Sequence, residues 1–164
     1  MLTRDKLTDA EWFAVRNTPY LVMLAVSAKG GSAFDDMLER KAGVQGIVDG
    51  AHSTHPIMRE VAADIMHAQD DVTNWLHSQP DAARTPALLH AKALESMQQA
   101  LDAIAAYGTA HDVHQYADFV IGVASRVSKA AREGDVMGMG GKVVSEGEGE
   151  FLAQLERLAQ AKGA

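Results

Sequence analysis

The hydrophobic positions between His111 and Gly134 recur at steps of three and four residues. The apolar members of this pattern are Val113, Tyr116, Ala117, Val120, Val123, Ala124, Val127 and Ala131. That spacing places them along one face of an α-helix. Phe119 and Ile121 add apolar surface outside this face, so we expect other helices to enclose most of this one. The pattern therefore predicts a central helix over residues 111–134.

Two helices are expected before residue 30. Thr8 and Glu11 have the spacing of a capping box, and an apolar side of Trp12, Phe13 and Val15 follows. Pro19 has no N–H and favours an extended conformation for the residue before it. We therefore expect a short first helix to end before Pro19 and an apolar second helix to run from there to about residue 28.

The next helix is expected to begin after Ser32, with Gly43 and Gly46 weakening it so that it frays or bends before residue 49. Its predicted inner face is formed by Phe34, Met37, Leu38, Val44 and Ile47. A further helix should begin at Thr54-His55-Pro56 and continue without interruption to about residue 79.

Two more helices complete the prediction. Thr85-Pro86 begins a long helix that ends near Gly108. Ser145 and Glu148 form a second capping box, and it opens a last helix. The inward residues of that helix are expected to be Phe151, Leu152, Leu155, Leu158 and Ala159.

The only candidate strand, residues 142–144, is too short to found a sheet. We therefore predict one all-α domain over residues 1–164, a bundle of about six helices in all with the 111–134 helix at its centre. Composition supports this class, because aromatic residues make up only 5% of the chain while alanine is frequent. Small apolar side chains suit close helix packing better than a β-sandwich.

The formal net charge of −7 argues against nucleic acid and against anionic membrane surfaces as partners. The chain has no cysteine, which excludes disulfides and thiolate chemistry and is compatible with a cytoplasmic protein. The apolar run over residues 20–28 is too short to span a bilayer. Acidic residues precede it, unlike the basic start of a signal peptide.

Two groups of histidines and carboxylates could bind a divalent metal. His111, His114 and Asp118 are spaced to share one helix face, and Asp64 and His67 form a second pair three residues apart. Helical bundles bind metals through such inward-facing pairs on several helices. The alternative is that all five residues belong to solvated outer faces of amphipathic helices.

A glycine-rich segment follows the central helix and is the second candidate for binding. Its residues are Met137, Gly138, Met139, Gly140, Gly141 and Lys142. GMGGK is similar to a phosphate-binding loop, but a valine follows the lysine where Ser or Thr is required. The alternatives are a tight chain reversal and a flexible methionine contact with a partner or a second subunit.

The segment Phe119–Leu158 resembles the C-terminal hairpin of small bacterial all-helical proteins. The likeness lies in VASRVSKAAREG, GMGGKVVS and EGEGEFL. More distantly, GGKVVSEGEGEFLAQL resembles the turn and helix of tellurite-resistance TerB-like domains. Gly140-Gly141 stands where that family has Asp-Gly, whereas Glu148 matches its glutamate. The resemblance implies an all-α bacterial protein and no particular activity.

No serine lies in a nucleophile elbow, and the sequence favours a protein that is not an enzyme. The leading hypothesis is a non-enzymatic helical scaffold or protein-interaction domain, with self-association as a homodimer as one form of it. The first alternative is a metal-binding bundle that uses the His and Asp residues named above. The second is a small-ligand pocket between the central helix and the 134–141 loop.

Overall fold

The computed structural model describes residues 1–28, 33–137 and 146–163, and the side chains of 33–36, 38, 134–137, 146 and 163 are outside the description. Within these ranges the chain forms helices and turns with no strand, which confirms the predicted all-α class. It has seven α-helices there rather than about six. The α-helices are α1 (Asp9–Ser27), α2 (Ala33–Val48), α3 (Pro56–Ala63), α4 (Ile65–Ser78), α5 (Pro86–Tyr107), α6 (Ala110–Met137) and α7 (Glu146–Gly163). The short 3₁₀ helices are η1 (Arg4–Lys6), η2 (Asp49–His52) and η3 (Asp81–Ala83).

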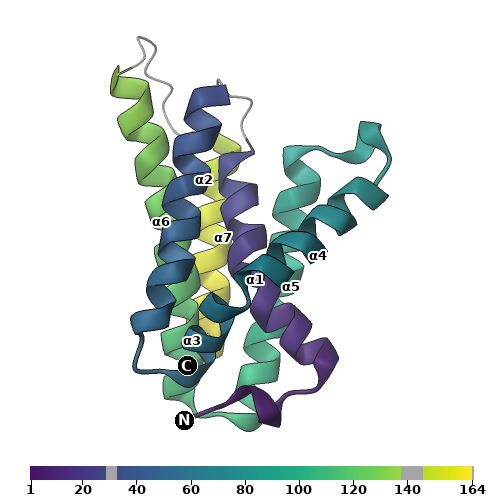
Figure 1. Ribbon diagram of the computed structural model, residues 1–164, viewed down its shortest axis with the longest axis vertical. Coiled ribbons are helices and arrows are strands. Elements are labelled where there is room, and N and C mark those ends of the chain that lie inside the picture. The colour runs from purple at the N-terminus through teal and green to yellow at the C-terminus, as the bar shows by residue number, and fades with distance from the viewer. Residues whose placement is uncertain (29–32, 138–145, 164) are drawn as a thin grey trace.

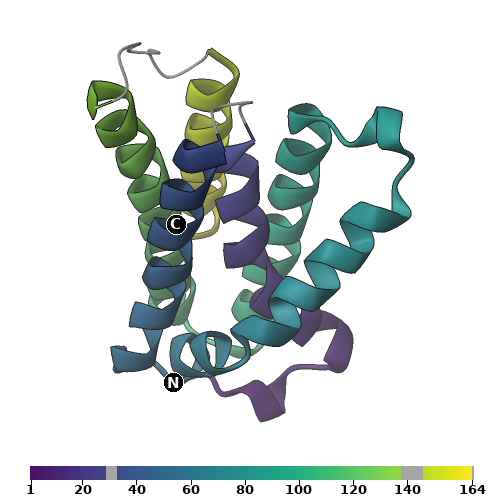
Figure 2. The same ribbon diagram turned by 45° about the horizontal axis from the view of Figure 1, so that its top comes forward.

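The helices form a bundle with a projecting arm. Helices α1, α2, α6 and α7 lie side by side with α5 packed on α1, whereas α4 extends away from them (Figure 1). Figure 2 shows the same arm from another side, with α4 and the start of α5 spread apart. α5 packs chiefly on α1 and also contacts α7 and α6, so it belongs to the bundle.

α6 is the helix that the sequence predicted at the centre. All eight residues of its predicted apolar face are buried, with at most 7% of any one exposed. The face contacts α1, α2, α5 and α7, so helices cover it from several directions. The prediction of a central helix is therefore confirmed, with α6 extending slightly beyond the predicted ends.

The prediction that Pro19 ends one helix and starts another is wrong. α1 is a single helix with Pro19 inside it, and the helix changes direction part-way along (Figure 1). Proline cannot donate to the carbonyl four residues earlier, so the carbonyl oxygen of Val15 loses its helical partner. The hydroxyl of Tyr116 on α6 donates to that oxygen at 2.7 Å, in a buried site. A neighbouring helix thus supplies the hydrogen bond that proline removes.

A second buried polar contact joins α1 to α5 nearby. The Thr18 hydroxyl lies 2.7 Å from the carbonyl oxygen of Ala14 and 2.7 Å from the Ser96 hydroxyl. Thr18 is fully buried and Ser96 is 5% exposed. Burial also raises the pKa of Tyr116 far above its usual range, so its hydroxyl keeps the proton it donates. The region around Pro19 therefore contains satisfied hydroxyl groups in an otherwise apolar core.

The prediction that Gly43 and Gly46 make their helix fray or bend is also wrong. α2 runs through both positions, and the glycines allow it to pack closely on its neighbours. A Cβ added at Gly43 would lie 2.2 Å from Cγ of Met23 and 2.9 Å from Cγ2 of Val127. One added at Gly46 would lie 3.1 Å from Cδ of Arg126. The glycines that weaken the isolated helix therefore permit its contact with α1 and α6.

The predicted uninterrupted helix over residues 56–79 is two helices, α3 and α4, separated at Asp64. His55 caps the first of them by accepting a hydrogen bond from the Ile57 amide. Asp64 has a non-helical ψ of 15°, and α4 leaves the bundle from this point (Figure 1). Two apolar residues expected to face inward are exposed instead, Phe13 by 50% and Met37 by 57%.

The last helix follows the prediction over its described part. Phe151 and Leu155 of α7 are 1% exposed, and Leu152, Leu158 and Ala159 pack against the core. The Phe151 ring stacks on His90 of α5 with centroids 4.5 Å apart. α7 therefore completes the bundle by packing on both α5 and α6.

We predict that Tyr116→Phe lowers the free energy of unfolding by about 1–3 kcal/mol, because the buried Val15 carbonyl then has no donor. In a Pro19→Ala background the new amide can donate to Val15, so the same substitution should cost less. Urea denaturation of the four proteins in this double-mutant cycle measures the coupling. An equal cost in both backgrounds would show that Tyr116 does not compensate for the proline.

We further predict that Gly43→Ala lowers the free energy of unfolding by about 1–3 kcal/mol despite its gain in helix propensity. The methyl group has no room between Met23 and Val127. Gly122→Ala on α6 is the matched control, because a Cβ there meets nothing within 4 Å. It should raise stability by about 0.5–1 kcal/mol. Thermal or urea unfolding tests both, and equal effects of the two substitutions would contradict the packing argument.

Candidate functional site

A buried histidine–carboxylate pair lies where the N-terminus, α3 and α6 meet. Nε2 of His55 is 2.6 Å from Oδ1 of Asp112, and the two residues are 1% and 2% exposed. Nδ1 of His55 accepts a hydrogen bond from the Ile57 amide, so the geometry assigns the donated proton to Nε2.

Both carboxylate oxygens of Asp112 accept hydrogen bonds. The carboxylate accepts from the Leu2 amide at 3.1 Å and from both the amide and the hydroxyl of Thr109, at 2.7 and 2.6 Å. Burial alone would raise the pKa of Asp112, but the hydrogen bonds from Thr109, His55 and Leu2 outweigh it and hold the pKa well below its usual range. Because neither member of the pair is accessible to solvent, this is a structural anchor rather than a reactive dyad.

A second polar cluster joins α1 to the start of the projecting arm. The Arg16 guanidinium, on a side chain only 13% exposed, forms ion pairs with Asp64, at 3.1 Å, and with Asp71. Asp64 also accepts hydrogen bonds from the Trp12 indole and the His67 ring. Although burial opposes it, these hydrogen bonds and the Arg16 charge lower the pKa of Asp64. The Asp64 carboxylate thus connects the start of α4 to α1, and both of its oxygens already have partners.

A cavity of about 470 Å³ lies beside this cluster. It is lined by Arg4, Trp12, Arg16, Glu60, Ala63, Asp64 and His67. Arg4 lies over the Trp12 ring, 5.4 Å from its centroid. The charged side chains of this cavity are thus largely engaged with one another, which leaves few free groups for a ligand.

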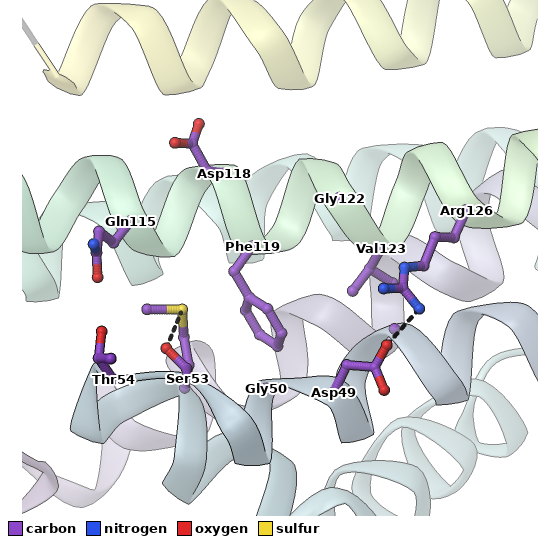
Figure 3. A pocket seen from close by; sticks show the side chains of 12 residues that line it. Asp49, Gly50, Ser53, Thr54, Gln115, Asp118, Phe119, Gly122, Val123 and Arg126 are labelled. Carbon is purple, nitrogen blue, oxygen red and sulfur yellow. Dashed lines mark hydrogen bonds and ion pairs between the residues drawn. The ribbon is translucent and has the colours of Figure 1, made fainter.

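An open groove lies between α6 and the segment from the end of α2 to the start of α3. It has a volume of about 520 Å³ and is open to solvent. It is lined by Gly46, Asp49, Gly50, Ser53, Thr54, Met58, Gln115, Asp118, Phe119, Gly122, Val123 and Arg126. Figure 3 shows the side chains of Gln115 and Thr54 directed toward each other across it.

The groove has an apolar middle between two polar ends. The Phe119 ring extends toward Gly50 (Figure 3), where an added Cβ would lie 3.0 Å from it. At one end Arg126 pairs with Asp49 at 2.6 Å. The hydrogen bond from Gln45, together with Arg126, lowers the pKa of Asp49, so this carboxylate stays ionised.

Gly122 is the feature of this groove that the fold does not explain. It lies inside α6, where glycine costs about 1 kcal/mol relative to alanine. A Cβ at Gly122 would meet nothing within 4 Å, in contrast to those at Gly43 and Gly46. No packing within the described chain therefore requires the missing side chain. The bare backbone leaves room on the groove side of α6.

The structure does not bring the predicted metal ligands together. His111, His114 and Asp118 are exposed along α6, whereas Asp64 and His67 hydrogen-bond to each other at the arm. Among the side chains that the structure describes, no three of His, Asp or Glu lie close enough to hold a metal ion. His114 instead hydrogen-bonds the Ala110 carbonyl, and Asp118 stands at the rim of the groove.

The predicted glycine-rich binding segment lies mostly outside the described residues. This applies to Gly138, Met139, Gly140, Gly141 and Lys142, whereas Met137 ends α6 without a described side chain. Binding by this segment therefore stays a prediction.

The chain matches no protein-family model, no curated protein and no solved structure. The resemblance to TerB-like domains likewise stays a prediction. Among the described helices, none has both the length and the apolar character needed to cross a membrane.

Sequence reasoning missed the buried pair and most of the groove. A signal for Asp112 was present, because Thr109 and Asp112 have the spacing of a capping box, and reciprocal hydrogen bonds between them are observed. No local signal connects His55 to Asp112, which lies 57 residues away. Gly122 was visible as a glycine inside a helical pattern, but only the packing shows that no side chain fills its place.

We predict that Asp112→Asn lowers the free energy of unfolding at pH 7 by about 2–4 kcal/mol. The folded-state pKa of Asp112 is below the unfolded value of 3.8, so its stabilisation is present above that pH and lost as pH falls. The difference between wild type and variant should therefore narrow from pH 5 to pH 2.5. Urea unfolding across this range measures it, and a constant difference would contradict the assignment.

Proposed function

We propose that this protein is a non-enzymatic protein-interaction domain, and that the groove beside α6 receives a peptide segment of its partner. The observation that carries the proposal is Gly122, an exposed glycine inside a helix with open space where a side chain would stand. Glycine inside a helix lowers the stability of that helix, and no packing within the described chain compensates for the loss at Gly122. Close approach by another backbone is the use that such a position offers.

The shape of the groove favours a peptide over a small molecule. Small-ligand sites are concave and bury about 70–90% of the ligand surface. This groove is open to solvent and continues along α6, so it suits an extended occupant that is covered on one side only.

The polar groups of the groove also fit a peptide backbone. The Gln115 amide offers donors and an acceptor, like a peptide unit, and faces the Thr54 hydroxyl across the groove (Figure 3). The partly exposed Phe119 ring provides apolar contact between these groups and the Asp49–Arg126 pair.

The test is a groove-filling substitution, Gly122→Leu, with Gly147→Leu as its matched control. Both glycines are helical, and an added Cβ meets nothing within 4 Å at either, but Gly147 is on α7 outside the groove. Both variants should fold, because leucine has the higher helix propensity. A library of random dodecapeptides displayed on phage is selected on the wild-type protein, and the recovered peptides are synthesised and their binding measured by fluorescence anisotropy.

We expect peptides that bind wild type and Gly147→Leu equally and lose at least about tenfold in affinity for Gly122→Leu. Amide NMR signals of Gly46, Gly50 and Gln115 should shift on binding. Recovery of no peptide, or equal binding to Gly122→Leu, would overturn the proposal.

A further inference from the structure

We infer that the peptide in the α6 groove carries a lysine or arginine against Asp118, two residues from a small or apolar residue that crosses Gly122. This inference rests on the proposed function and adds the chemistry of the partner. It starts from the charges that line the groove, which are those of Asp49, Asp118 and Arg126.

Two of these three charges balance each other. Arg126 and Asp49 form an ion pair at 2.6 Å, and Gln45 donates to the other oxygen of Asp49 at 2.7 Å. Lys129, one turn further along α6, is within 4.0 Å of Glu133. The cations of this part of α6 therefore already face carboxylates.

Asp118 is the charge of the groove that stays unbalanced. It is exposed at the rim, on the side of α6 away from Ser53 (Figure 3), and makes no hydrogen bond or ion pair with any described residue. A cationic side chain on a bound peptide would form an ion pair with the Asp118 carboxylate. The net charge of −7 on the whole chain favours the approach of the same kind of partner.

The spacing follows from helix geometry. Asp118 and Gly122 are four residues apart, or about 6 Å along the axis of α6. An extended peptide rises about 3.3 Å per residue, so 6 Å corresponds to two residues. The inference therefore specifies a basic residue, one intervening residue and a small or apolar residue, in either chain direction. The apolar side chain would contact the partly exposed Phe119 ring.

The experiment uses the peptides recovered on the wild-type protein and the variant Asp118→Asn. Asp70→Asn is the matched control, because it makes the same change in net charge at an exposed site on α4. Exposed ion pairs are weak, so we expect a loss of about two- to fivefold in affinity for Asp118→Asn and none for Asp70→Asn. Raising the salt concentration from 0.05 to 0.5 M should weaken wild-type binding more than that of the Asp118 variant.

Peptide sequences provide the second readout. Selection on wild type should enrich the basic–any–apolar pattern, and selection on Asp118→Lys should replace its lysine or arginine by an acidic residue. Peptides without this pattern, or unchanged affinity for Asp118→Asn, would overturn the inference about the basic residue. Loss of binding to Gly122→Leu would in that case still support the groove as the peptide site. Full binding to Gly122→Leu would remove the groove itself, so the two failures are distinguishable.

Discussion

The hydrogen bond from Tyr116 to the Val15 carbonyl is the constraint on which the arrangement of the bundle depends. Pro19 leaves that carbonyl without a helical donor in the middle of α1, where no water reaches it. An unpaired buried carbonyl would cost about 1–3 kcal/mol. The bond requires α6 to cross α1 at one height and in one rotation, so it sets the register of the two helices that the others cover.

The polar anchors outside the core connect segments that are distant along the chain. Asp112 joins the N-terminal residues and α3 to the start of α6, and Arg16 joins α1 to α4 through Asp64. The first anchor is fully buried, whereas the second is partly open to water. α4 is held by the second anchor, by its packing against α1 and by Lys92 of α5, which lies over the Trp75 ring. The arm is thus less enclosed than the bundle.

Glycines divide into two kinds on the surfaces of α2 and α6. Gly43 and Gly46 allow α2 to approach α1 and α6, because a side chain at Gly43 would collide with Met23 and one at Gly46 would press on Arg126. Gly122 has the same chemistry but no neighbour. Unlike Gly147, which also meets no neighbour, Gly122 borders the groove, and we propose that an approach from outside the chain uses this space. This contrast, rather than any reactive group, is the reason for placing function at the groove.

The sequence by itself determined which segments are helical and which face of α6 is buried, because a helical period and a cap such as Thr8 depend on neighbouring residues only. It also singled out Asp64, His67 and Asp118, but not what each contacts. Only the tertiary structure decided that Pro19 lies inside a helix, that the chain breaks at Asp64, and that Gly122 borders a groove. At each of these places the contacting group comes from a segment far along the chain: the Tyr116 hydroxyl at Val15, the Arg16 guanidinium at Asp64 and the residues around η2 beside Gly122. A local sequence pattern does not show which distant segment will pack against it.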